Sequence, residues 1–236
     1  MNKDKIIVAL DVDSAEKAVK LAAKLKDDVG AFKVGLQLIN SAGLGIFDEL
    51  KAAGAKNIFY DCKYHDIPNT VKGASEAACA MGIWMFNVHC SGGYAMMKAA
   101  ANAAKAASEQ LGKPRPLVIG VTVLTSIDKE TLNNDIRVPG EPAEQVVHLA
   151  KLAKEAGLDG VVSSPLEIEL IREACGPDFL IVTPGVRPKG ADVGDQKRIM
   201  TPAEAVAKGS DYLVIGRPIT KAEDPAQAAR NIAAEL

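Results

Sequence analysis

Short runs of apolar and β-branched residues recur along the chain at a nearly even interval, and polar residues follow most of them. These runs cover residues 6–13, 31–36, 57–63, 85–90, 116–124, 160–164, 179–186 and 211–217. Strands that are buried on both faces of a parallel sheet have this near-continuous apolar character. The pattern therefore predicts one parallel strand for each run.

Segments of helical character lie between the runs. They include residues 14–25, 92–111, 141–157 and 201–209, two of which begin at potential N-caps, Ser14 and Thr201. The alternation of eight strands with helices in 236 residues predicts an α/β fold, a (β/α)8 TIM barrel. A doubly wound open sheet is the alternative. No linker-like tract or shift in composition divides the chain, so we expect a single domain over residues 1–236.

Charged and polar residues stand at or just after the carboxyl ends of the predicted strands. In a (β/α)8 barrel these ends and the loops that follow them form the catalytic face. The residues are Asp11, Asp13, Lys33, Asp61, Lys63, His89, Thr125 and Arg217. We therefore expect all of them at one end of the barrel.

The stretch IFYDCKYHDIPNTV, residues 58–71, holds the densest group of charges. Ionisable side chains cluster between Asp61 and Asp66, although a buried charge is costly unless it is paired. Side chains alternate along a strand, so Asp61 and Lys63 share one face and Cys62 takes the other. If Cys62 faces the helices, both charges face the barrel mouth, whereas Asp66 lies too far along to be positioned by the same pleat. The group indicates an active site, and an ion-pair network that only stabilises the barrel is the alternative.

Composition and charge exclude some classes of partner. The chain is 48% apolar and 25% charged, with a net charge of -2 and a pI near 6.0, so no global basic field attracts nucleic acid or an anionic membrane. A phosphorylated ligand would need a local basic site. The apolar run before Asp11 is too short for a signal peptide or a membrane span, so we expect a cytoplasmic protein. The cysteines lack zinc-ligand spacing and are expected to be free thiols.

At the charged stretch the sequence resembles the orotidine 5'-phosphate decarboxylase family. The family pattern D-x-K-x-x-D-I-P-x-T is present as Asp61, Lys63, Asp66, Ile67, Pro68 and Thr70. Further similar segments run along the whole chain: ALDVDS, FKVG, NVH, VTVLTS, TPGVR, GDQKR and VIGRPIT. The resemblance implies decarboxylation of orotidine 5'-monophosphate to uridine 5'-monophosphate in pyrimidine biosynthesis, with no metal and no organic cofactor.

The resemblance also implies the roles of the charged residues. Lys63 would face the carbanion at C6 and donate the proton that replaces CO₂, with Asp61 near the departing carboxylate. Lys33 and Asp66 would complete a Lys-Asp-Lys-Asp array. Asp66, together with Ile67 and Thr70, would come from a neighbouring subunit, which implies a symmetric homodimer with shared sites.

The remaining implied residues bind the substrate. Asp11 and Lys33 would bond the ribose, and Thr125 would contact the pyrimidine ring. The phosphate would be held by Arg187, Gln196, Gly216 and Arg217. The long, charged segment 185–198 contains the first two of these and is expected to act as a lid.

Two other functions remain open. One is a metal-dependent sugar-phosphate decarboxylase or hexulose-phosphate synthase of the same barrel group, in which we expect an acidic metal ligand in place of Lys33 and no Ile-Pro-x-Thr after the second Asp. The other is a non-catalytic nucleotide-binding barrel, which would most plausibly have lost the proton donor at Lys63. An assay of orotidine 5'-monophosphate turnover with and without a chelator separates them.

Overall fold

The strands close into a parallel barrel in which each strand pairs with the next along the chain and β8 pairs with β1. The computed structural model describes residues 2–188 and 200–236. The strands are β1 (Ile6–Ala9), β2 (Ala31–Val34), β3 (Ile58–Tyr64), β4 (Met85–His89), β5 (Leu117–Val121), β6 (Gly160–Val162), β7 (Leu180–Pro184) and β8 (Tyr212–Ile215). The predicted (β/α)8 barrel is confirmed.

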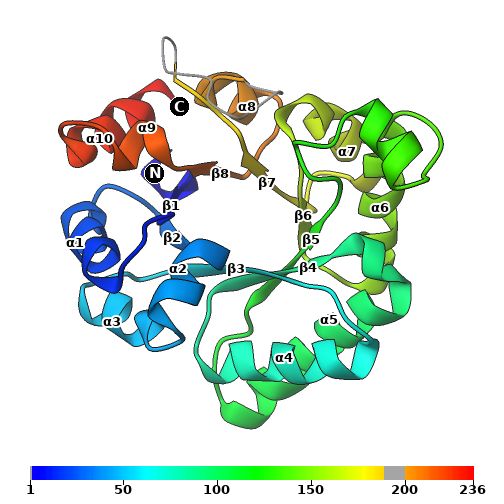
Figure 1. Cartoon of the computed structure of the whole chain (residues 1–236), viewed down its shortest axis with the longest axis horizontal. Helices are drawn as coiled ribbons and strands as arrows, with labels where there is room; N and C mark the ends of the chain where they lie inside the picture. Colours follow the sequence, from blue (N-terminus) through cyan, green and yellow to red (C-terminus); the bar gives the residue numbers. More distant parts are fainter. Residues whose placement is uncertain (1, 189–199) are drawn as a thin grey trace.

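Helices surround the barrel as an outer ring (Figure 1). They are α1 (Ala15–Leu25), α2 (Leu36–Ala42), α3 (Ile46–Ala52), α4 (Pro68–Ala80), α5 (Gly93–Leu111), α6 (Pro142–Ala156), α7 (Ile168–Cys175), α8 (Pro202–Ala207), α9 (Arg217–Thr220) and α10 (Pro225–Glu235). Ser14 and Thr201 cap α1 and α8 as predicted, because their side chains accept hydrogen bonds from backbone N–H groups of the first turn. Within the described residues, no helix combines the length and apolar character that a membrane crossing needs.

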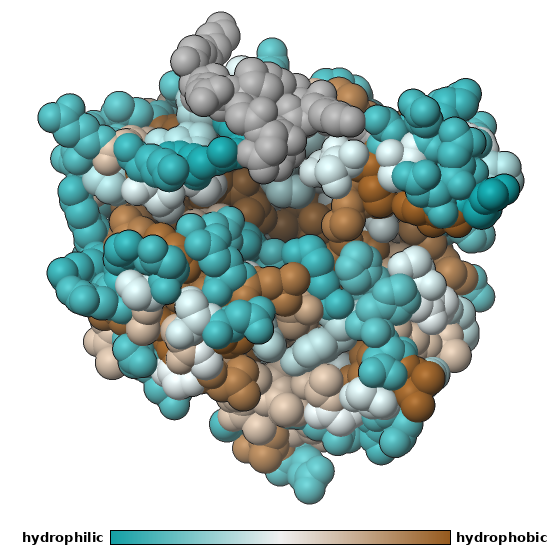
Figure 2. Space-filling view, viewed as in Figure 1, coloured by the Kyte–Doolittle hydropathy of each residue, from teal (hydrophilic) through white to brown (hydrophobic). Residues whose placement is uncertain are grey.

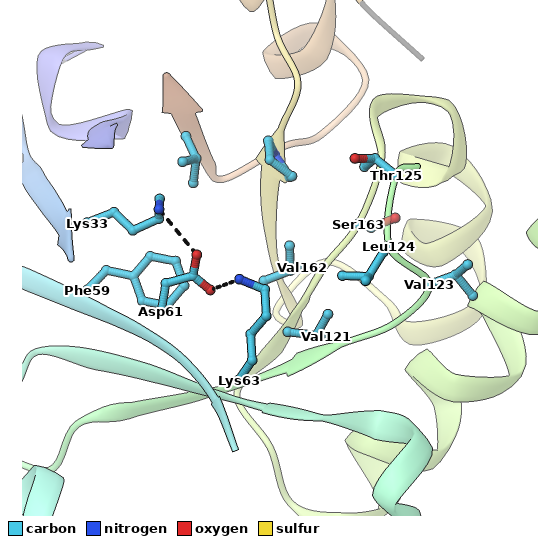
Figure 3. A pocket seen from close by; sticks show the side chains of 12 residues that line it. Lys33, Phe59, Asp61, Lys63, Val121, Val123, Leu124, Thr125, Val162 and Ser163 are labelled. Atoms are coloured by element: carbon cyan, nitrogen blue, oxygen red, sulfur yellow. Dashed lines mark hydrogen bonds and ion pairs between the residues drawn. The ribbon is translucent and has the colours of Figure 1, made fainter. Parts of the chain in front are cut away.

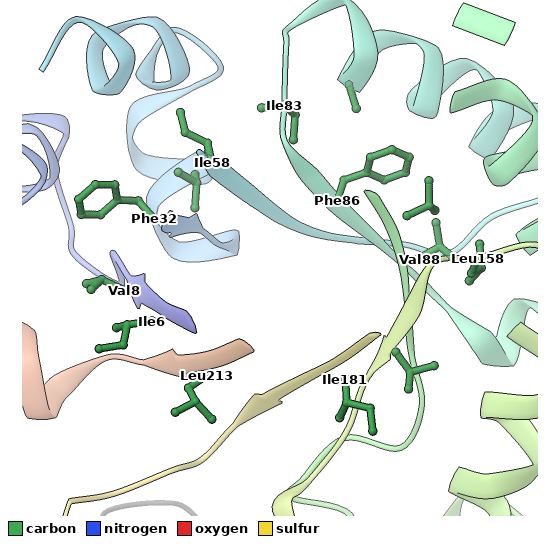
Figure 4. Close-up of a cluster of buried hydrophobic side chains, with 14 of the residues drawn as sticks. Ile6, Val8, Phe32, Ile58, Ile83, Phe86, Val88, Leu158, Ile181 and Leu213 are labelled. Atoms are coloured by element: carbon green, nitrogen blue, oxygen red, sulfur yellow. The ribbon is translucent and has the colours of Figure 1, made fainter. Parts of the chain in front are cut away.

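The core has two layers, which explains why the strands are apolar on both faces. Ile7 and Phe59 belong to a cluster inside the barrel. Alternate residues such as Val8, Phe32 and Phe86 belong to the larger cluster between strands and helices (Figure 4). Burial of both faces removes the polar alternation that a half-exposed sheet would show.

All strands except β3 are shorter than the predicted apolar runs, and this changes the setting of several polar residues. β1 ends at Ala9, so Asp11 and Asp13 lie in the following loop, and β8 ends at Ile215, so Arg217 begins α9 instead of closing a strand. Pairing stops where the chain turns towards the next helix. Asp13 is exposed and forms an ion pair with Lys17 of α1.

Candidate active site

Two adjoining cavities open at the carboxyl ends of the strands. One has a volume of about 190 Å³ and the other of about 670 Å³, and both are lined by Lys33, Asp61, Pro184 and Val214. Figure 2 views this face of the molecule and shows hydrophobic residues inside its central hollow, with hydrophilic residues around the rim. The charged side chains at the shared wall therefore lie where an apolar and a polar compartment meet.

Asp61 is held between two ammonium groups at that wall (Figure 3). Its Oδ1 accepts a hydrogen bond from Lys63 Nζ at 2.6 Å, and its Oδ2 lies 3.3 Å from Lys33 Nζ. Lys33 Nζ also donates to Asp11 Oδ1 at 3.0 Å. β2, β3 and the loop after β1 thus bring together an alternating series of charges, the charged chain of the site: Asp11, Lys33, Asp61 and Lys63.

Burial and the neighbouring charges shift the pKa values of Asp61 and Lys33 in opposite directions. Burial by itself would raise the pKa of Asp61, but Lys33 and Lys63, helped by a hydrogen bond from Asn87, hold it below its usual range. Burial would likewise lower the pKa of Lys33, but the carboxylates of Asp61 and Asp11 outweigh it and raise that pKa. Both groups are therefore charged at neutral pH, because each provides the other's counterion.

The backbone at Lys63 departs from regular strand geometry. Lys63 has a φ of 51°, in the left-handed region, and the pairing of β3 with β4 shifts register between Tyr60 and Tyr64. A non-glycine residue in this region costs about 1–2 kcal/mol. Asp61 and Lys63 do line one cavity as predicted, and Cys62 packs with the outer core, but simple alternation does not account for the position of Lys63.

Sequence reasoning missed two residues at this point. Asn87 on β4 donates to Asp61 Oδ1 and accepts from the Lys63 backbone N–H, each at 2.7 Å. Gly35 follows β2, and a Cβ on it would lie 2.8 Å from Lys33 Nζ, so a side chain there would push against the charged chain. Both lie in segments that the family resemblance covers, NVH and FKVG, but neither is an ionisable residue.

The smaller cavity is mainly apolar away from the charges. Thr125 lines it, as does Ser163, among side chains from β3, β5, β6, β7 and β8 and from the loop after β5. The apolar lining residues are Phe59, Val121, Val123, Leu124, Val162, Pro184 and Val214. A planar ring with a few polar substituents suits such a compartment.

The larger cavity carries a cationic group of side chains. Arg187, Arg217 and Lys221 line it together with Gly216, and Asp11 and Gln37 line it as well. Arg187 is 9% exposed, and its Nη1 donates to the Val186 carbonyl at 2.9 Å. This is the local basic site that a phosphorylated ligand needs. Gln196 and most of segment 185–198 lie outside the described residues.

Asp66, Ile67 and Thr70 do not line either of these cavities. All three are exposed, Ile67 to 67%, and Asp66 Oδ1 accepts a hydrogen bond from the Ile67 backbone N–H. They lie near the start of α4, and Asp66 and Ile67 line a surface depression with His65. The His65 ring lies against that of His89, with centroids 5.4 Å apart. The predicted fourth member of the charge array is thus not brought to the others within the chain.

Among residues 2–188 and 200–236, no group of three or more His, Cys, Asp and Glu side chains is arranged to hold a metal ion. The carboxylates nearest the cavities, Asp11 and Asp61, are instead bridged by the Lys33 ammonium. A lysine in this position would repel a divalent cation.

Replacing Asp61 by asparagine tests the electrostatic balance of the site. We expect a loss of roughly 3 kcal/mol in the free energy of unfolding at pH 7, because a buried counterion is removed. The folded pKa of Asp61 is lowered from 3.8, so its stabilising contribution is complete above pH 3.8 and is lost as the pH falls through the folded pKa. Urea unfolding from pH 7 to pH 3 should therefore show the gap between wild type and variant narrowing in acid.

Asp13→Asn is the matched control, because the exposed pair of Asp13 with Lys17 should contribute little at any pH. A gap for Asp61→Asn that stays constant across this range would contradict the account of the charged chain.

Comparison with known proteins gives one consistent family. Residues 4–232 match the model of the orotidine 5'-phosphate decarboxylase / HUMPS family. Orotidine 5'-phosphate decarboxylase of Moorella thermoacetica is 55% identical over 234 residues, with 99% of this chain and 92% of the relative covered. That of Trichlorobacter lovleyi is also 55% identical, with 99% and 95% covered.

A solved structure supports the same assignment. The crystal structure of orotidine 5'-phosphate decarboxylase from Lactobacillus acidophilus is similar with a TM-score of 0.86 and 41% identity, covering 98% of this chain and 97% of that one. Fold, full-length coverage and identity agree, and the chain belongs to the orotidine 5'-phosphate decarboxylase / HUMPS family.

Proposed function

We propose that this protein decarboxylates orotidine 5'-monophosphate to uridine 5'-monophosphate and CO₂ in pyrimidine biosynthesis. The observation that carries the proposal is the charged chain, in which ion pairs link Asp11, Lys33, Asp61 and Lys63. It lies between an apolar cavity and a cationic one. Curated relatives at 55% identity bear the name of this enzyme.

The reaction places its demand on electrostatics. The bond from C6 to the carboxylate breaks, and the electron pair stays on C6, in an orbital that cannot delocalise into the ring. A fixed positive charge aimed at that position stabilises the developing carbanion, and this is usually the largest catalytic contribution. Lys63 would supply the charge, and its Nζ would then give C6 the proton that replaces CO₂.

Asp61 would contribute to the breaking of the same bond in two ways. It holds the Lys63 ammonium through the 2.6 Å hydrogen bond, which fixes the charge before the substrate arrives. It would also lie near the departing carboxylate, where like charges repel.

The substrate would span both cavities. Thr125 would contact the pyrimidine in the apolar one, and Asp11 and Lys33 would bond the ribose at the shared wall. Arg187, Gly216 and Arg217 would bind the phosphate, with Gln196 as a further predicted partner. Binding energy from the phosphate could then be used to hold C6 against Lys63.

The charged chain also argues against the metal-dependent sugar-phosphate enzymes of the same family. Lys33 Nζ lies between Asp11 and Asp61, where those enzymes would need an acidic ligand. A non-catalytic barrel is disfavoured because Lys63, the proton donor, is present and paired. The proposed reaction accordingly needs no cofactor.

Turnover of orotidine 5'-monophosphate, followed by its ultraviolet absorbance, tests the function. We expect decarboxylation that is unchanged after exhaustive chelation, and a loss of at least roughly 10³-fold in Lys63→Ala, because the countercharge and the proton are both removed. Lys20→Ala is the matched control, since Lys20 is an exposed lysine on α1 paired with Glu16. Activity that chelation abolishes and Mg²⁺ restores would move the assignment to the sugar-phosphate enzymes.

We further propose that the active enzyme is a symmetric dimer in which Asp66, Ile67 and Thr70 complete the neighbour's site. All three are exposed, and Asp66 lies beyond the end of β3 and lines neither cavity, which supports this. Each site would then combine Lys63 of one chain with Asp66 of the other.

Mixing two inactive variants tests the shared site. Lys63→Ala and Asp66→Ala subunits that exchange at random form mixed dimers in about half of cases, each with one intact site of two, so activity should recover to roughly a quarter of wild type. A mixture of Lys63→Ala with Asp61→Asn is the control and should not recover, because both residues act in the same chain. If verified exchange restores no activity in the first mixture, Asp66 serves its own chain.

A further inference from the structure

Asn87 is a fully buried polar residue at the centre of the proposed site. It lies on β4, where it pairs in register with Ile119 of β5, and its side chain is 0% exposed. Its neighbours Phe86 and Val88 belong to the outer core and Met85 to the inner one, so alternation turns Asn87 towards the barrel interior. The usual role of a buried polar side chain in such a position is to stabilise the barrel and not to take part in a reaction.

Both the nitrogen and the oxygen of the Asn87 side-chain amide form hydrogen bonds with residues of β3. Nδ2 donates to Asp61 Oδ1 at 2.7 Å, and Oδ1 accepts from the Lys63 backbone N–H at 2.7 Å. Asp61 Oδ1 is the same oxygen that receives Lys63 Nζ at 2.6 Å. One side chain therefore joins the carboxylate, the lysine backbone and, through the shared oxygen, the lysine ammonium.

This bridge coincides with the irregular backbone. Lys63 is left-handed, with a φ of 51°, and the ladder between β3 and β4 shifts register between Tyr60 and Tyr64. The Lys63 N–H bonds to the Asn87 side chain, so Asn87 satisfies the donor that the irregularity frees. An amide can do this and also donate to a carboxylate, whereas an aliphatic side chain can do neither and an ionised acid can only accept.

We propose that Asn87 is a positioning residue for the decarboxylation, which holds the Lys63 ammonium and the Asp61 carboxylate in the geometry that the reaction needs without touching the substrate itself. The inference rests on the proposed function. Through Asn87, β4 would position the charged residues of β3, which the charged residues of β2 and β3 do not do by themselves.

The expected consequence is specific to the chemical step. Without the bridge the Lys63 backbone can return to an ordinary strand conformation, which moves its ammonium, and a misplacement of about 1 Å can cost about 10²-fold in rate. Of the groups proposed to bind ribose and phosphate, Asp11 and Arg217 lie after other strands, and Lys33 keeps its own hydrogen bond to Asp11. Substrate and product affinity should therefore change little.

The first test is Asn87→Leu, which keeps a similar volume and removes both hydrogen bonds. We expect kcat to fall by about 10²-fold, with KM and the affinity for uridine 5'-monophosphate within about threefold of wild type. Thr183→Val is the matched control, because it removes another buried polar group of the barrel, one that bonds Ser210 and not the site. It should retain the wild-type kcat.

The second variant, Asn87→Asp, gives a signature that a structural role would not produce. The new carboxyl can replace the donor to Asp61 only while it is protonated, and once ionised it repels Asp61. It would lie against Asp61 and Lys63 on β3, with Lys33 on β2 paired to that Asp61 and His89 two residues along its own strand. Activity should therefore fall as the pH rises through the pKa of the new carboxyl, whereas wild type has no carboxyl at this position to titrate.

The outcomes are distinct. An inactive wild type would mean that the proposed function is wrong, whereas an active wild type with Asn87→Leu at full kcat would overturn the role of Asn87 alone. A loss of kcat that Thr183→Val matches would also overturn it, as a general effect of burying fewer polar groups. If Asn87→Leu does not fold, Asn87→Asp decides: a wild-type pH profile and kcat would contradict the proposal.

Discussion

The carboxylate of Asp61, held between two ammonium groups, is the interaction on which the rest of the site depends. Asp61 is largely buried, so its charge is sustained by Lys33 at 3.3 Å and Lys63 at 2.6 Å. The same contacts keep Lys33 charged and hold both lysines in position. The cost of reorganising solvent around a developing carbanion is then met during folding, before the substrate binds, which is what electrostatic preorganisation requires.

The barrel supplies what this interaction needs. Parallel pairing places the ends of β2, β3 and β4 next to one another, so charges that are distant in sequence meet at one mouth. Apolar side chains below and beside them keep the local dielectric low and strengthen each contact. On the other side, the cationic cavity offers a grip for a phosphate that is remote from the bond that breaks.

The fold could be read from sequence because it depends on a repeated local signal, eight apolar runs with helices between them. Asp61 and Lys63 were predicted to share one face because they are two residues apart, and they do line one cavity, although alternation alone does not set the position of Lys63. Asn87 could not, because its contact with Lys63 depends on how β4 lies against an irregular β3 and not on any local pattern. The left-handed backbone of Lys63 and the close approach of Gly35 to Lys33 are likewise consequences of packing. Asp66 was predicted to lie off the pleat, and it lines neither of the two cavities that Asp61 lines.

The central claim is that Lys63 provides a fixed charge for an anion at C6. The most direct measurement compares the binding of uridine 5'-monophosphate with that of an analogue carrying an oxyanion on C6, in wild type and in Lys63→Ala. We predict that wild type binds the anionic analogue at least about 10³-fold more tightly, and that Lys63→Ala loses most of this preference while it binds uridine 5'-monophosphate within about threefold of wild type. A preference that Lys63→Ala keeps in full would contradict the account.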